Sequence, residues 1–375
     1  MKDQKFERKK KMAKRLNGKT KIVISPKGHK NIGNIMKKIL LISFVLLQLA
    51  VNAQDPFFTQ AFNAPLTLNP ATAGNGEMDL RFTAAFKRHW INVPSAMQFA
   101  AVGVDKYIKN LHGGIGLSLS NSKEGYLNKT LLSGLYSYML CLPNARLHLG
   151  LQAGVGNRSV NYGKLYFSDQ IDNTGIIPGS ITGADRPLNN NKYFADFGAG
   201  FLLYYKENWM IGGGAQHINQ PDESLTSNTI SKLPMRSFGY IRYKYNLDES
   251  GDRYLLPSML LHHQQNSNSF SFGCEYKDAR VGIGAWYRGN VNFQNSDAFA
   301  ITLSLDLFDR RENDVDRVRV GMSYDATTSK LGFSRSAGSA EGAFVWEKLT
   351  QKGIRSDERC DADYTMKGTP CPPRF

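Results

Sequence analysis

Apolar and polar residues alternate one by one along most of the chain after residue 77. Around residue 150, for example, Leu147, Leu149 and Leu151 alternate with His148 and Gly150. Successive side chains of a β-strand point to opposite faces, so each such segment has one apolar face and one polar or glycine face. No amphipathic helix of comparable clarity competes with this pattern, which therefore predicts an all-β fold.

The alternation defines about fourteen strands, separated by turns rich in Gly, Asn and Asp. In chain order they cover residues 78–87, 97–106, 112–120, 129–140, 146–156, 193–205, 208–216, 236–245, 255–263, 269–276, 281–288, 299–306, 317–325 and 342–347. An even number of strands of about ten residues is typical of bacterial outer-membrane barrels. We predict a transmembrane antiparallel β-barrel over residues 78–349, preceded by a cleaved signal peptide.

A soluble β-sandwich would show the same alternation, but its turns recur at shorter intervals. Aromatic residues also gather at the predicted strand ends, as the interfacial girdles of a membrane barrel require. They are Trp90, Tyr107, Tyr136, Tyr138, Tyr193, Tyr204, Tyr205, Trp209, Tyr243, Tyr245, Tyr287, Tyr324 and Trp346. The hydrophobic content of 41% fits a barrel, because only one face of each strand meets lipid.

A secretory signal peptide is predicted at residues 36–53. Met36-Lys37-Lys38 precedes a short apolar run, residues 39–49, and small residues end in Ala53. The run is well below the ~20 residues of a membrane-spanning helix. We expect cleavage between Ala53 and Gln54, and no cysteine follows that would carry a lipid anchor.

The basic charge lies mostly in this leader. The chain has 47 Lys+Arg against 32 Asp+Glu, but fourteen of the basic residues and only two of the acidic ones precede Gln54. Residues 1–35 form a basic extension, and we interpret Met36 as the true start. A nucleic-acid partner would depend on this discarded segment alone and is not expected.

Two predicted loops, residues 159–191 and 218–233, exceed turn length. They follow the fifth and seventh strands, so a first strand that starts in the periplasm puts both loops outside the cell. Long loops of bacterial barrels usually lie there.

Four cysteines remain to be placed. An exported compartment permits a disulfide between Cys360 and Cys371, which lie close together in sequence, although four free thiols remain the alternative. No His or further Cys stands at ligand spacing near them, so we expect no metal site.

No catalytic motif is found. His262-His263 is not an H-E-x-x-H zinc motif, and the chain has no G-x-S-x-G elbow. The glycines of 212–214, Gly154 and Gly156 lie within strand patterns, where they relieve crowding on the inner wall rather than bind phosphate. We therefore expect neither an enzyme nor a cofactor.

Several short motifs follow one another in a fixed order along the chain. They are Asp55-Pro56-Phe57-Phe58 with Gln60, Asn69-Pro70-Ala71 with Gly74, Arg88-His89-Trp90, His217-Ile218-Asn219-Gln220-Pro221, Leu256-Pro257-Ser258-Met259-Leu260 and Cys371-Pro372-Pro373-Arg374-Phe375. This set resembles the PorP/SprF family of type IX secretion-system outer-membrane proteins. The chain departs from the family pattern in two places: His89 stands where the family usually has Gln, and the last motif has one extra proline.

The resemblance implies a bacterial outer-membrane protein of Bacteroidetes that serves type IX secretion by handling or docking exported proteins, gliding-motility adhesins among them. Its implied partners are the periplasmic ring with its associated lipoproteins, the secreted substrates and outer-membrane lipid. A passive porin or solute channel is the alternative function.

Residues 54–77 show no clean alternation yet carry several large apolar side chains, which should not lie bare in water. We interpret them as a periplasmic segment that packs into the barrel mouth, binds a partner or simply leads into the first strand. The partner-binding candidates are Asp55, Pro56, Phe57, Phe58, Gln60, Asn69 and Pro70. Residues 350–375 are interpreted as a periplasmic tail, either docking or solvated.

Overall fold

The computed structural model describes residues 55–360, with gaps at 95, 174, 183–189, 207, 226–229, 250, 291–295, 308–315, 330–331 and 351–358. The basic extension, the signal peptide with its cleavage site at Ala53 and Gln54, and Cys371 lie outside these residues.

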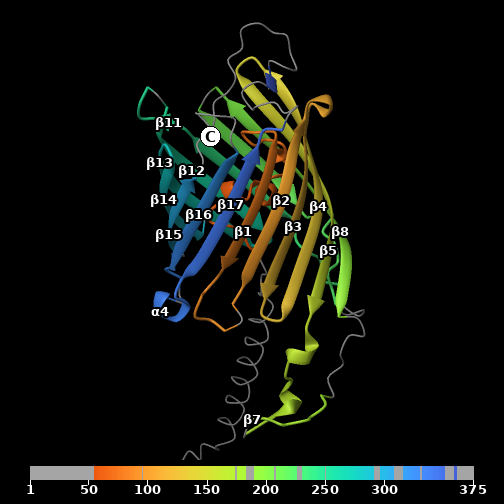
Figure 1. The fold of residues 1–375 in the computed structure, drawn as a ribbon. Helices are drawn as coiled ribbons and strands as arrows, with labels where there is room; N and C mark the ends of the chain where they lie inside the picture. The colour runs from red at the N-terminus through yellow and green to blue at the C-terminus, as the bar shows by residue number, and fades with distance from the viewer. Residues whose placement is uncertain are drawn as a thin grey trace, which may run out of the picture. The chain divides into compact units, whose positions relative to one another are not determined.

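Fourteen long antiparallel strands form one sheet in the described part of the chain (Figure 1). They are β1 (Leu80–Arg88), β2 (Gln98–Ile108), β3 (Gly113–Glu124), β4 (Leu127–Leu142), β5 (Ala145–Val160), β8 (Asn191–Tyr205), β9 (Trp209–Gln216), β10 (Arg236–Tyr243), β12 (Arg253–Gln264), β13 (Ser267–Asp278), β14 (Val281–Asn290), β15 (Ser296–Asp306), β16 (Arg317–Thr327) and β17 (Ser339–Lys348). Each strand pairs with the next, and β1 pairs with β17, so the sheet closes on itself. The predicted fourteen-strand barrel is confirmed.

The remaining elements are short. They are η2 (Ala61–Asn63), α3 (Pro65–Leu68), η3 (Pro70–Thr72), η4 (Lys109–Leu111), η5 (Tyr162–Lys164), η6 (Ser168–Gln170), β6 (Ile171–Asp172), β7 (Gly175–Ile176), β11 (Tyr245–Asn246) and α4 (Phe333–Ser336). Among the described residues, no helix is long and apolar enough to span a membrane.

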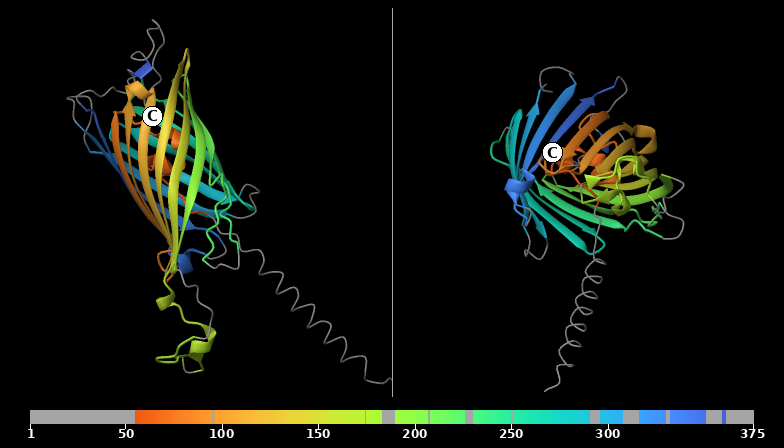
Figure 2. Two further views of the ribbon diagram at one scale, coloured as in Figure 1. Left: turned by 90° about the vertical axis from the view of Figure 1, so that its right-hand side faces the viewer. Right: turned by 90° about the horizontal axis from the view of Figure 1, so that it is seen from below.

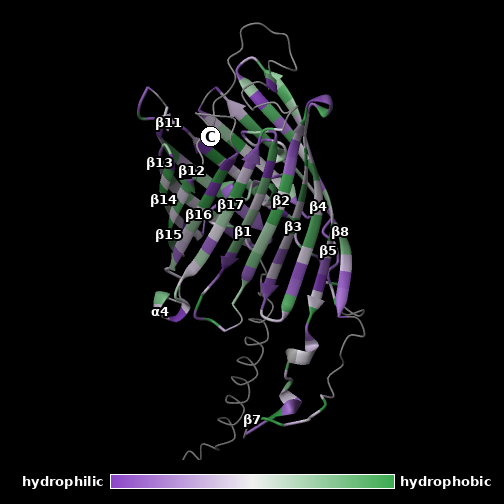
Figure 3. Cartoon of the chain, viewed as in Figure 1, coloured by the Kyte–Doolittle hydropathy of each residue, from purple (hydrophilic) through white to green (hydrophobic). Residues whose placement is uncertain are grey.

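The two faces of the wall differ as the alternation predicts, and green and purple positions alternate along the strands that face the viewer in Figure 3. Outward residues are apolar and exposed to the surroundings of the barrel, such as Leu151 at 62% and Ile301 at 67%. Inward residues are mostly polar or glycine. Two aromatic residues expected in the interfacial girdle, Tyr107 and Tyr204, are instead buried, because they occupy inward positions of β2 and β8.

The barrel has two different mouths. The start of β1 and the end of β17 lie at one, which we call the inner mouth. The long loops 161–190 and 217–235 both leave the opposite one, the outer mouth, as the strand count predicted (Figures 1 and 2). Long loops of outer-membrane barrels lie on the extracellular side, which gives the mouths their names.

Candidate functional site: the plugged lumen

Residues 55–76, the plug segment, lie inside the barrel, where Figure 2 shows an orange chain within the ring of strands. The segment begins at the outer mouth, where the Asp55 amide donates to the Gln264 side chain at 2.8 Å. It ends near the inner mouth, where the Gly74 amide donates to Asp105 at 2.6 Å. The sequence analysis placed these residues in the periplasm, with packing into the barrel mouth as one alternative; in the structure their partners lie along the inner wall, from one mouth to the other.

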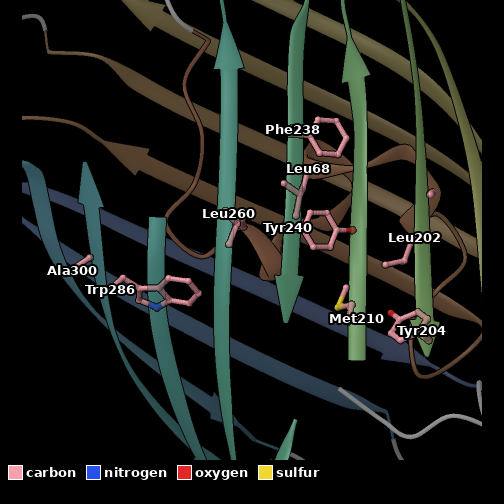
Figure 4. Close-up of a cluster of buried hydrophobic side chains, with 11 residues drawn as sticks. Leu68, Leu202, Tyr204, Met210, Phe238, Tyr240, Leu260, Trp286 and Ala300 are labelled. Carbon is pink, nitrogen blue, oxygen red and sulfur yellow. The ribbon is translucent and has the colours of Figure 1, made fainter. Parts of the chain in front are cut away.

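Apolar side chains of the plug segment pack into separate clusters on the wall. Phe58 is 3% exposed and stacks on Phe99 of β2, while Leu66 packs beside Leu135 of β4. Leu68 joins the largest cluster, on β8 to β15, which Figure 4 shows. Burying one such side chain stabilises by about 1.5–3 kcal/mol, so the plug segment is held firmly in place.

The wall has glycines where the plug segment comes closest. A Cβ atom on Gly150 would overlap the backbone of Ala71, and one on Gly114 would overlap that of Gly74. Only a residue without a side chain permits such an approach between two backbones. The inner surface of β3 and β5 is thus shaped to receive the plug.

Asn69 joins the plug segment to two strands and is completely buried. Its amide nitrogen donates to the Phe201 carbonyl at 2.8 Å and to the Tyr240 hydroxyl at 3.0 Å. Its side-chain oxygen accepts from the Ala71 amide and so caps η3, whose first residue is the buried Pro70. Because the buried Asn69 amide is hydrogen-bonded on both its nitrogen and its oxygen, it holds the plug segment in one position relative to the wall.

A second anchor is the central charge cluster, which consists of Lys87, Arg288, Asp325 and Glu341 on β1, β14, β16 and β17. The Lys87 ammonium is fully buried, 3.0 Å from Asp325 and 3.5 Å from Glu341.

The plug segment completes this cluster. The backbone amides of Thr59 and Gln60 donate to Glu341 at 2.7 and 2.8 Å. The Thr59 hydroxyl contacts Asp325 at 2.8 Å and accepts from Arg288 at 2.6 Å. Buried charges are tolerated when they are paired and hydrogen-bonded, as here, and two positive charges balance two negative ones.

At the outer mouth, the carboxylate of Asp55 forms what we call the outer latch with Lys129, His217 and Gln264. Its oxygens lie 2.6 Å from the Lys129 ammonium, 2.7 Å from the Gln264 amide and 3.1 Å from His217 Nε2. The other ring nitrogen of His217 lies 2.5 Å from Asp196. An imidazole between two carboxylates is held in its protonated form, which donates to both.

The pKa values of Asp55 and His217 in the outer latch are shifted. Burial acts to raise the pKa of Asp55, but the Lys129 charge and the His217 hydrogen bond outweigh it and lower this pKa well below 3.8. Burial acts to lower the pKa of His217, but its hydrogen bonds to Asp196 and Asp55 raise this pKa above 6.5. The latch therefore requires an ionised Asp55 and a charged His217.

We expect the outer latch to be pH-dependent. The stabilisation from His217 is complete below pH 6.5 and is lost as the pH rises through its raised pKa; that from Asp55 is complete above pH 3.8 and is lost in acid. Proteolysis near Asp55, or the mobility of a spin label at the neighbouring Pro56, should therefore increase toward alkaline pH. His217→Gln removes the titration, so its mobility should not change across that range; an identical alkaline rise in this variant would contradict the assignment.

Three described residues of the C-terminal tail, Thr350, Arg359 and Cys360, contact the barrel at the inner mouth. The amide and the hydroxyl of Thr350 donate to the Asp79 carboxylate at 2.7 and 2.6 Å. Arg359 is fully buried, donates to the carbonyls of Gly74 and Met78, and stacks over Tyr107 at 4.4 Å. The tail thus holds the end of the plug segment.

Cys360 forms a disulfide with Cys141, with 5.7 Å between their Cα atoms. The prediction that Cys360 pairs with Cys371 is therefore wrong. Cys141 lies at an inward position near the inner end of β4, which is where the buried Arg359 brings its neighbour.

Peptide mapping under non-reducing conditions tests this pairing. We expect one cross-linked peptide that contains Cys141 and Cys360, and its loss in Cys141→Ser. The free thiol of Cys274, which is on β13, serves as the internal control for labelling. A peptide linking Cys360 to Cys371 would restore the original prediction.

All seven residues proposed from the sequence as partner-binding candidates lie in the lumen. Asp55, Gln60 and Asn69 bond to wall or plug atoms, Phe57 stacks on His262, and Pro56, Phe58 and Pro70 are buried. The sequence analysis missed their partners on the wall. The available indication was a charge at an inward strand position, as at Lys87.

Fold and site together define an outer-membrane β-barrel with a segment of its own chain packed in the lumen. The model of the type IX secretion system membrane protein PorP/SprF matches residues 50–341, so the chain belongs to this family. It is therefore a protein of the bacterial outer membrane that takes part in type IX secretion, and membership implies interaction with other components of that system.

Solved structures with a similar fold are outer-membrane barrels of low sequence identity. The outer-membrane protein Omp33 of Acinetobacter baumannii is 7% identical, with 75% of this chain and 100% of that chain covered and a TM-score of 0.40. A mutant of TodX, a monoaromatic hydrocarbon channel, is 10% identical, with 77% and 94% covered and a TM-score of 0.44. Comparison with curated proteins gave no match.

Proposed function

We propose that this barrel is a closed docking component of the type IX secretion system, which handles exported proteins, gliding-motility adhesins among them, at the outer mouth. The observation that carries the proposal is the plug segment, which extends from the outer mouth to the inner mouth. Because this segment occupies the lumen and is bonded to several strands of the wall, the protein works by binding rather than by conducting.

The same geometry disfavours the alternative of a passive porin. Porins leave a water-filled lumen, whereas here apolar clusters and the central charge cluster join the plug segment to opposite sides of the wall. The occluded lumen is therefore better suited to a structural and recognition role.

An enzymatic role also lacks support. Ser137 and His148 lie 3.5 Å apart on β4 and β5, which is the pairing that a lumenal hydrolase would need. Both side chains are buried, however, and the Ser137 hydroxyl donates to the Ala71 carbonyl of the plug segment at 3.0 Å. A substrate would have no access to this pair, so we propose a non-enzymatic function.

The proposal is tested by deleting the gene in the native host and comparing the exported and periplasmic proteomes. We expect a small set of exported proteins to disappear from the surface and accumulate in the periplasm, with recovery on complementation. An unchanged surface proteome combined with reduced uptake of small solutes would instead support a porin.

A further inference from the structure

A cavity of about 240 Å³ lies at the outer mouth, between the plug segment and the ends of several strands. We call it the outer cavity. Phe57 of the plug segment, Trp90 and Met97 supply its apolar surface, while Ser269 and Arg288 supply polar groups. It is smaller than a drug-sized pocket and has room for about one large side chain with its backbone.

Trp90 stands at this cavity in an unusual backbone conformation. Its φ is +48°, a left-handed value that is rare for a bulky side chain and costs on the order of 1 kcal/mol or more. Two backbone hydrogen bonds hold the following residues, from Ile91 to Gly338 and from Asn92 to Ser336, at 3.0 and 3.1 Å. The indole is 37% exposed, so the strain keeps an aromatic ring available to a binding partner.

Buried polar atoms lie beside this ring without partners. The Ser269 hydroxyl and Arg288 Nε have no hydrogen-bond partner among the described residues, and each side chain belongs to a residue only 8% exposed. His262, directly opposite Ser269 in the register of β12 and β13, also has both ring nitrogens unpartnered. Such groups cost about 1–3 kcal/mol each unless something pairs with them.

The chemistry of these groups selects a ligand. Arg288 Nε can only donate and the Ser269 hydroxyl is able to donate, so both accommodate an acceptor oxygen such as a peptide carbonyl. The apolar surface formed by Phe57, Trp90 and Met97 accommodates a hydrophobic side chain at the same time. A carbonyl oxygen next to a hydrophobic side chain is the chemistry of a peptide, so the site favours a peptide.

We infer that the outer cavity binds an extended segment of an exported partner protein. The segment inserts an apolar side chain against Trp90 and Phe57, and places a backbone carbonyl on Arg288 and Ser269. This inference rests on the proposed function and adds to it the recognition site and the chemistry of the partner. Because Phe57 belongs to the plug segment, the bound partner contacts the plug directly.

The test replaces Trp90 with the photo-crosslinking amino acid p-benzoylphenylalanine in living cells. Matched replacements at Tyr166, on the loop after β5, and at Phe299, on the lipid face, are 58% and 56% exposed and serve as controls. We expect irradiation at position 90 to give an adduct with one reproducible segment of an exported protein, mapped by mass spectrometry. Adducts only with lipopolysaccharide, equal yields at the three positions, or no adduct at position 90 would overturn the inference.

Binding of the synthetic peptide for the mapped segment to the purified full-length barrel provides the second measurement. Ser269→Ala and Trp90→Ala should each raise Kd by about tenfold or more, while Phe299→Ala leaves it unchanged. Wild-type affinity in the cavity variants would refute the site even if gene deletion abolished secretion. Secretion unaffected by deletion would instead refute the proposed function.

Discussion

Deleting Asp55–Asn75 should convert a non-conducting barrel into an ion-conducting channel in planar bilayers. Fourteen strands enclose a lumen that holds water unless chain fills it, and the plug segment is the chain that fills it here. The central charge cluster stays neutral without the plug, so its residues tolerate water in the opened lumen. We expect conductance to rise roughly tenfold or more.

Folding of the deletion variant is checked by its heat-modifiable migration in gels. Gly150→Val offers a second route, because the new side chain overlaps the plug backbone at Ala71 without removing any residue. Leu151→Ala, at the neighbouring lipid-facing position, is the matched control and should not raise the conductance. A wild-type barrel that already conducts steadily would contradict the occluded lumen.

Lys87→Met should produce the largest loss of stability among single substitutions in the lumen. The change removes a fully buried cation and leaves Asp325 and Glu341 with only Arg288 to balance them. Breaking a buried ion pair in this way costs about 3–5 kcal/mol. The free energy of unfolding, from urea denaturation followed by tryptophan fluorescence in lipid vesicles, measures the effect.

A compensating substitution separates charge from packing. Lys87→Met combined with Glu341→Gln restores a neutral cluster and keeps one acceptor for the plug amides, so at least part of the lost stability should return. Lys348→Met, at the exposed end of β17, is the control and should change little. Equal stability of Lys87→Met and the wild type would show that this cluster contributes no net stability.

The barrel could be predicted from sequence because lipid imposes a strict condition on each strand. Where a residue faces hydrocarbon it must be apolar, so alternation marks the strands directly. The ends of the strands were predicted less accurately: β5 extends to Val160, four residues past the predicted end at Gly156. No alternation marks these last residues, Asn157 to Val160, so pattern alone could not assign them.

The position of the plug segment and the pairing of the disulfide could not be predicted from the alternation of apolar and polar residues. Neither has a period, and their partners lie far away in sequence: Thr59 bonds to Glu341, and Cys141 to Cys360 across 219 residues. Only the closed ring brings these positions together. The large apolar residues of the plug segment did indicate that it must be buried, but not that it is buried inside its own barrel.

The path of the plug segment also limits how the protein is assembled. Its last residues lead directly into β1, and β1 with β17 forms the seam between the two ends of the sheet. If the barrel closed first, the apolar side chains of Phe58 and Leu66 would have to pass the charged residues of the inner wall to reach their positions. We therefore expect the pairing of β1 with β17 to form last, after the plug segment has taken its place on the inner wall.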